Sequence, residues 1–183
     1  MIAQLVTSLR LCSALLAAHG DEVSPARLCR AAVIVAHVAD EWPPELLASI
    51  AYRESRFDPS AVNAVTGCWG PMQVSTRRRD HNEWAGYVAG VVKLREARRY
   101  CARRGEGELC VLAAYASGPA GVRGRWYRGP RRVLRDAARL KSLTGRRHGA
   151  QGDPATGFAV VPHETAADGH LSNPAPSAGQ RRA

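Results

Sequence analysis

The sequence has few aromatic residues, almost no lysine and no long apolar run. Phe, Trp and Tyr together make up 6% of the 183 residues, which argues against a β-sandwich with an aromatic-rich core. The apolar runs are shorter than the roughly 20 residues that a membrane-spanning helix needs, so no transmembrane segment is expected. Hydrophobic residues still make up 45% of the chain, which is enough for the core of one compact domain.

Positive charge is abundant and is concentrated in one part of the chain. The formal net charge is +10, and only Lys93 and Lys141 among the 26 cationic residues are lysines. Residues 71–147 hold 19 cationic and 6 anionic side chains, whereas the segments on either side are slightly acidic. Such a block attracts polyanions, including anionic cell-wall polymers, although an Arg-rich solvated surface is the alternative interpretation. No nucleic-acid-binding motif accompanies it, so no specific nucleic-acid partner is expected.

Helix signals recur through residues 24–143, and this segment is predicted to be one all-α domain. Pro25 and Pro44 each stand where the first residue of a helix is expected. Apolar residues at helical spacing continue through residues 84–102, and no convincing strand pattern interrupts them. From residue 144 to 183, small and polar residues with Gly and Pro predominate, which predicts a disordered tail.

The first 23 residues have two interpretations. An apolar run follows Arg10 and ends in small residues, as in a secretory signal peptide. The alternative is an N-terminal amphipathic helix. Its apolar face would consist of Ile2, Leu5, Leu9 and Leu16.

The 5 cysteines offer several pairings. Loss of Cys12 with a signal peptide would leave an even number. Cys101 and Cys110 flank a short turn and could form a disulfide if the two helix ends approach each other. Cys29 and Cys68 would then be the remaining pair. Buried free thiols are the alternative.

Glu54 stands out because it lies near the C-terminal end of the helix predicted from residue 45 to 55. The helix dipole disfavours an anion there, and partial burial next to Ile50 and Ala51 would raise the pKa of the carboxyl group. A carboxyl group that keeps its proton near neutral pH can act as the general acid in glycosidic cleavage. An exposed Glu54 paired with Arg53 or Arg56 is the structural alternative.

Three motifs in order resemble the soluble lytic transglycosylase family, in the lysozyme-like superfamily with goose-type lysozymes. They are Glu54-Ser55, the loop Asn63-x-x-x-Gly67-x-x-Gly70-Pro-Met72-Gln73, and Ala114-Tyr115-Ala-Ser-Gly118-Pro119. The resemblance covers roughly residues 33–125 and implies an all-α lysozyme-like domain with a short loop-rich cleft segment. It implies cleavage of peptidoglycan outside the cytoplasm, by a periplasmic, secreted or phage-delivered enzyme.

The resemblance also implies roles for individual residues. Glu54 would be the catalytic acid and then the base, and Ser55 would support a nearby backbone or substrate group. Met72 and Gln73 would line the sugar cleft, and Tyr115 would place its hydroxyl near Glu54. For Met72 and Tyr115, ordinary burial is the competing interpretation.

Two glycine-loop residues complete the predicted substrate site. Gly70, like Gly67, would permit the sharp turn that brings Gln73 close. Trp69, inside the same loop, is the candidate for stacking on a sugar ring.

The third motif departs from the family pattern, because Ala116 stands where an Asn usually follows the Tyr. This puts fine positioning of the substrate in doubt. No second catalytic carboxylate is obvious, since Asp58 precedes Pro59 and reads as a turn residue, and Asp80 and Glu83 lie beyond the loop. A single acid favours a transglycosylase that needs neither cofactor nor metal. A hydrolytic muramidase and a degenerate wall-binding or virion module remain alternatives.

Overall fold

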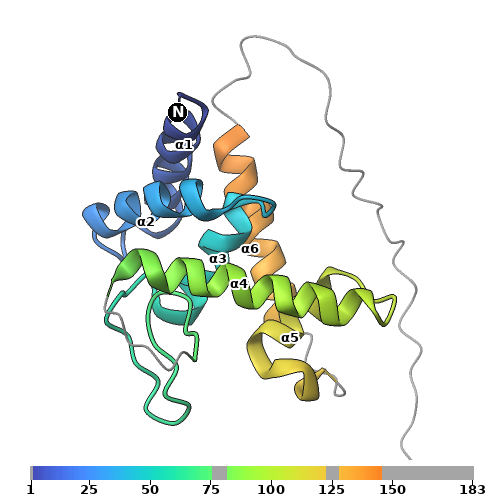
Figure 1. Cartoon of the computed structure of the whole chain (residues 1–183). Helices are drawn as coiled ribbons and strands as arrows, with labels where there is room; N and C mark the ends of the chain where they lie inside the picture. Colours follow the sequence, from blue (N-terminus) through green and yellow to red (C-terminus); the bar gives the residue numbers. More distant parts are fainter. Residues whose placement is uncertain (1, 76–81, 123–127, 146–183) are drawn as a thin grey trace, which may run out of the picture. The chain divides into compact units, whose positions relative to one another are not determined.

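The computed structural model describes residues 2–75, 82–122 and 128–145 of the chain. Within these ranges all regular structure is α-helical (Figure 1), apart from two isolated bridges that join Trp69 to Val62 and to Val74. The helices are α1 (Ile2–His19), α2 (Pro25–Val38), α3 (Pro44–Ser55), α4 (Glu83–Ala102), α5 (Glu108–Gly121) and α6 (Arg128–Gly145). The all-α prediction is confirmed, whereas the predicted tail lies, from residue 146 onward, outside the described residues.

α2 and α3 begin and end where the sequence indicates. Pro25 and Pro44 are their first residues, because the fixed backbone angle of proline suits the first turn and its missing N–H is not needed there. α3 ends as Arg56 and Phe57 take positive φ values of 54° and 61°. This left-handed turn buries Phe57 completely and directs the chain away from the helix, directly after Glu54 and Ser55.

α3 is the most deeply buried helix of the domain. Residues 46–51 are all buried, and the helix packs against α2 and α6. α4 runs across the view in Figure 1, contacts α2, and forms an extensive interface with α5. Glu54 therefore projects from a helix whose position is fixed on several sides.

α1 packs on α2 and α6, and its buried side differs from the predicted one. Leu11 is 1% exposed and Leu15 is fully buried. Ile2, Leu5 and Leu9 are instead 81%, 60% and 64% exposed, so the predicted apolar face is wrong at these three positions, whereas Leu16 is partly buried and packs against the core. The side of α1 that is buried is decided by α2 and α6, which pack against it. The spacing of apolar residues within α1 does not show which side those helices cover.

α1 is also, by length and composition, apolar enough to cross a membrane, and it lies close to the N-terminus. The expectation that the chain has no transmembrane segment rested on uninterrupted apolar runs, and α1 instead carries polar residues among its apolar ones. A signal sequence and a core helix both fit such a helix. The choice between a signal peptide and a retained N-terminal helix stays a prediction.

The cysteines pair only partly as predicted. Cys101 and Cys110 form a disulfide across the α4–α5 turn, which confirms the first pairing. The second is wrong: Cys29 is bonded to Cys12, and Cys68 is a free thiol. The reason is that α1 lies along α2 and brings Cys12 next to Cys29, a proximity that depends on tertiary packing.

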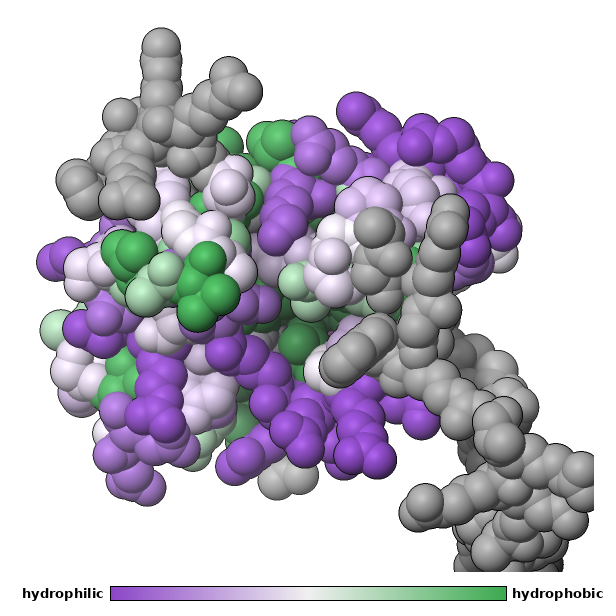
Figure 2. Space-filling view, turned by 90° about the horizontal axis from the view of Figure 1, so that it is seen from below, coloured by the Kyte–Doolittle hydropathy of each residue, from purple (hydrophilic) through white to green (hydrophobic). Residues whose placement is uncertain are grey.

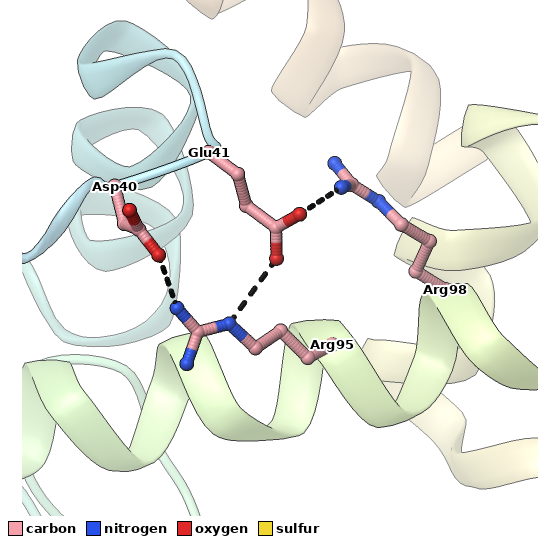
Figure 3. Close-up of polar contacts among 4 residues, drawn as sticks. All are labelled: Asp40, Glu41, Arg95 and Arg98. Atoms are coloured by element: carbon pink, nitrogen blue, oxygen red, sulfur yellow. Dashed lines mark hydrogen bonds and ion pairs between the residues drawn. The ribbon is translucent and has the colours of Figure 1, made fainter.

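The turn between α2 and α3 is anchored to α4 by a charged network (Figure 3). Arg95 contacts Asp40 at 2.5 Å and Glu41 at 3.1 Å, and Arg98 contacts the other oxygen of Glu41 at 2.6 Å. The Arg98 guanidinium also lies 3.6 Å from the centre of the Trp42 ring. Part of the basic block is therefore neutralised within the fold.

Candidate active site

Glu54 lines a small pocket between α3, α5 and α6, here called the Glu54 pocket. Its volume is about 120 Å³. The charged residue in the wall is Arg53, which pairs with Asp136 at 2.6 Å. The rest of the wall is mainly apolar and includes Ile50, Leu112, Tyr115, Ala116, Pro130 and Val133. An apolar wall around a carboxyl group disfavours its ionised form.

The carboxyl group of Glu54 is accordingly perturbed. Desolvation raises the pKa of Glu54, and the positive charge of Lys93 opposes this shift. By surface area the residue as a whole counts as exposed, so the desolvation comes from the protein atoms on the pocket side while another side meets solvent. The side chain of Glu54 forms no hydrogen bond with any residue that the structure describes. The predicted direction of the shift therefore agrees with the structure.

Lys93 is a residue that the sequence analysis missed. Its Nζ atom lies 4.5 Å from the centre of the Tyr115 ring, and its charge acts on Glu54. One signal was present in the sequence: a lysine between Val92 and Leu94, in a chain with only two lysines. Nearly all other cationic residues of the chain are arginines, so a lysine at this position was an unusual feature.

Tyr115 is buried and its hydroxyl is already engaged. It is 2% exposed and donates a hydrogen bond of 2.5 Å to the backbone carbonyl of Met72. Burial raises the pKa of Tyr115, and the negative charge of Glu54 adds to this effect. The side chain thus borders the Glu54 pocket, while its hydroxyl secures the loop that precedes α4.

Met72 is fully buried and lies against Gly90 of α4, whereas Pro71, the residue before it, lies against Gly86. A Cβ atom placed on Gly90 would be 2.3 Å from the Met72 sulfur, and one on Gly86 would be 2.6 Å from Cδ of Pro71. The absence of side chains at these two helical positions lets the loop approach the α4 backbone. The environment of Met72 is that of a core residue, which was the alternative to its predicted place in the sugar cleft.

Ser55 joins the end of α3 to the same loop. Its hydroxyl donates a hydrogen bond of 2.8 Å to the Pro71 carbonyl and accepts one of 3.1 Å from the N–H of Asp58. Both bonds hold backbone, which fixes the loop beside the helix end that carries Glu54.

Gln73 turns back into its own loop. Its φ is +46°, and its side-chain amide nitrogen donates hydrogen bonds of 3.1 Å to the Ala61 carbonyl and 3.0 Å to the Gly70 carbonyl. Gly70 has a φ of +77°, a conformation that glycine adopts without a steric penalty. The expected turn is present, and it directs the Gln73 nitrogen inward.

Trp69 is 4% exposed and takes part in both isolated bridges of the loop. Stacking of a sugar on its ring would require the loop to open. The structure therefore brings Ser55, Met72, Gln73 and Tyr115 together around the loop, and it places Trp69 inside that loop.

Comparison with protein-family models gives one match: the transglycosylase SLT domain, over residues 31–132. The match spans more than half of the chain. The chain belongs to the transglycosylase SLT domain family. No curated protein and no solved structure matches. Membership supports a lysozyme-like, glycan-cleaving function with peptidoglycan as the substrate, and action outside the cytoplasm.

Helical residues lie on both sides of the matched segment. α1 lies wholly outside it, and so does α6 beyond residue 132. α1 and α6 contact each other. Of the α6 residues that line the Glu54 pocket, Pro130 lies inside the matched segment and Val133 directly follows it.

None of the other carboxylates considered from the sequence lines the Glu54 pocket as described. Asp58 accepts hydrogen bonds from the N–H and the hydroxyl of Ser60, and these bonds lower its pKa, as expected for a turn residue. Glu83 borders a separate cavity beside Arg30. Asp80 lies outside the described residues. The described part of the SLT domain also contains no cluster of three His, Cys, Asp or Glu side chains that could hold a metal ion.

Proposed function

We propose that the protein is a peptidoglycan lytic transglycosylase, with Glu54 as its acid and base. It would cleave the β-1,4 bond between N-acetylmuramic acid and N-acetylglucosamine. The observation that carries the proposal is a carboxyl group with a raised pKa in an apolar-walled pocket, at the position that matches the family's catalytic glutamate.

The reaction needs one carboxyl group used twice. Protonated Glu54 gives its proton to the glycosidic oxygen, and the bond between that oxygen and the muramyl C1 breaks. The oxygen leaves as the 4-hydroxyl of N-acetylglucosamine. The muramyl 6-hydroxyl then attacks C1 and its proton returns to Glu54, which closes a 1,6-anhydro ring without consuming water.

The pocket supports this route over hydrolysis. An inverting glycosidase uses a second carboxylate to activate water, and a retaining one uses it as a nucleophile. Among the described residues, only Glu54 contributes a carboxylate to the pocket lining. An attacking hydroxyl supplied by the substrate itself removes the need for that second group.

The electrostatics of the pocket suit a group that changes protonation twice. Desolvation favours the protonated acid that starts the reaction, while the charge of Lys93 favours the carboxylate that forms after proton transfer. Opposing influences of this kind keep the pKa of a catalytic group within reach of the working pH.

Ala116 supports a second candidate function. It is exposed and lines the Glu54 pocket, at the position where the family usually has an asparagine. A pocket that lacks this amide has fewer polar groups with which to orient a sugar. The alternative is therefore a wall-binding module of the same fold that retains the glycan site and has lost the reaction.

The mass of the cleavage products separates these candidates. Purified peptidoglycan is digested with the wild-type protein and with the Glu54→Gln and Glu96→Gln variants. Glu96 is an exposed residue of α4 and serves as the charge-matched control. Transglycosylation predicts fragments that lack the mass of one water relative to reducing ends, lost in Glu54→Gln and retained in Glu96→Gln.

Other outcomes contradict the proposal. Reducing-end products identify a hydrolase. Binding to peptidoglycan with no cleavage by the wild-type protein identifies a wall-binding module. Cleavage that persists in Glu54→Gln removes Glu54 from the catalytic role.

A further inference from the structure

A second and larger cavity lies beside the first turns of α6, here called the arginine pocket. Its volume is about 590 Å³. Its lining consists of Leu109, Leu134, Arg128, Arg131, Arg132 and Arg135. Figure 2 shows the side of the molecule that is turned downward in Figure 1, where broad hydrophilic areas surround smaller hydrophobic ones.

The four arginines of this pocket differ from most other arginines of the fold. Arg95 and Arg98 on α4, Arg53 on α3, and Arg104 after α4 each contact a carboxylate within 3.1 Å. None of the four in the arginine pocket forms an ion pair with a described residue. Within the described part of the chain, four guanidinium groups around one cavity therefore have hydrogen-bond donors left for an anionic ligand.

The arginine pocket and the Glu54 pocket lie on different faces of the same helical turns. Pro130 and Val133 line the Glu54 pocket, whereas Arg131 and Leu134, the next residues along, line the arginine pocket. Successive residues of an α-helix point about 100° apart, and the helix with its side chains is about 10 Å across. A ligand that reaches from one pocket to the other must span roughly that distance, which three extended amino-acid residues do.

The neighbouring surface limits the length of the anion that fits. Leu109 and Leu134 also line an adjoining cavity of about 490 Å³, whose other lining residues include Glu106 and Glu108. Glu106 is paired with Arg104, but Glu108 has no ion pair among the described residues, so in this direction the four arginines are followed by an unpaired carboxylate. A long polyanion that continued in this direction would meet Glu108, whereas a short ligand with two or three carboxylates would end before it.

We propose that the arginine pocket binds the carboxylates of the peptide stem attached to the muramyl residue in the Glu54 pocket. The proposal rests on the function proposed above, because the glycan strand must occupy the Glu54 pocket for the stem to start beside α6. The apolar walls of Leu109 and Leu134 suit the aliphatic parts of a stem, and the guanidinium forks suit its carboxylates. The enzyme would thus prefer glycan strands that carry stems over strands from which an amidase has removed them.

The test compares cleavage of stem-bearing and amidase-stripped glycan strands. The variant is Arg131→Gln combined with Arg135→Gln, and the control is Arg99→Gln combined with Arg103→Gln, two exposed arginines at the end of α4. We expect the wild-type protein and the control to favour stem-bearing strands by roughly tenfold or more, as lost hydrogen bonds to charged groups would give. The Arg131/Arg135 variant should lose most of this preference. Equal thermal unfolding temperatures show that the variants are folded.

A binding measurement distinguishes failure of this inference from failure of the proposed function. Soluble stem tripeptide is titrated into Glu54→Gln protein with and without the Arg131/Arg135 changes. Weaker binding with the changes supports the inference even if no preparation cleaves glycan. Equal binding, or an unchanged preference for stem-bearing strands, overturns it. If the changes reduce only binding to walls that carry anionic polymers, the pocket recognises those polymers and the inference is wrong.

Discussion

The residues of the candidate site fall into two groups that use their polar atoms in opposite ways. Ser55, Gln73 and Tyr115 direct their polar atoms to backbone carbonyls of the loop. The carboxyl group of Glu54 forms no hydrogen bond with the described residues. The first group holds the site in place, and Glu54 is left to react. A family motif can therefore mix residues of both kinds at adjacent positions, as Glu54 and Ser55 show.

The largest expected effect separates activity from stability at Glu54. General acid–base catalysis contributes about 10²- to 10⁴-fold to rate, so Glu54→Gln should lower the cleavage rate by that order. Its unfolding temperature at pH 7 should equal or exceed that of the wild type, because desolvation destabilises the ionised form in the folded state.

The sign of the stability effect follows from the raised pKa. The protonated form of Glu54 is favoured in the folded protein, so its stability contribution is present below the unfolded pKa and is lost as pH rises through the folded pKa. The difference between variant and wild type should disappear at low pH. A Glu54→Gln variant that unfolds at a markedly lower temperature at pH 7 would place Glu54 in the first group.

Gly90→Ala tests how tightly the loop is seated on α4. The added Cβ atom would lie 2.3 Å from the Met72 sulfur and 2.8 Å from its Cβ, so the loop must shift. Overpacking of this kind costs about 1–3 kcal/mol, and we expect the upper part of this range. Chemical denaturation measures it, with Gly107→Ala as the control, since nothing lies within 4 Å of a Cβ there.

Tyr115→Phe tests whether the tyrosine hydroxyl belongs to the loop or to the chemistry. Removal of the hydroxyl leaves the buried Met72 carbonyl without its hydrogen bond, which should cost about 1–2 kcal/mol of unfolding free energy. The unfolding temperature and kcat are measured together. A full loss of kcat at unchanged stability would instead mean that the hydroxyl acts on the substrate.

Lys93→Met should give the smallest effect, a displaced pH profile. The positive charge of Lys93 lowers the pKa of Glu54, so its removal lets desolvation raise that pKa further. The protonated acid then persists to higher pH, and the alkaline limb of the pH–rate profile shifts to higher pH. Lys141→Met, on α6, is the control. An alkaline limb that stays at the same pH, or shifts to lower pH, would show that Lys93 does not act on the catalytic group.

The sequence predicts the local features well, because they depend on neighbouring residues. Pro25 and Pro44 mark two helix starts, and Glu54 lies at a helix end because Phe57, Asp58 and Pro59 stop the helix. The disulfide between Cys101 and Cys110 follows from one short turn.

Features that depend on tertiary packing are not visible in the sequence. The bond between Cys12 and Cys29 requires α1 to lie along α2. The inward turn of Gln73 depends on carbonyls of Ala61 and Gly70 that a loop of unknown path does not reveal. Charge counting also fails here, since it gives Arg95 and Arg131 the same weight although only Arg95 has carboxylate partners among the described residues.

The disulfide between Cys101 and Cys110 has a consequence for proteolysis. It encloses the α4–α5 turn, in which residues 102–105 are exposed, so this turn offers a protease a site for cleavage. A cut there would leave α4 and α5 covalently joined, and the two fragments would separate only after reduction. Limited trypsin digestion should thus give one band on a non-reducing gel and two bands once a thiol is added.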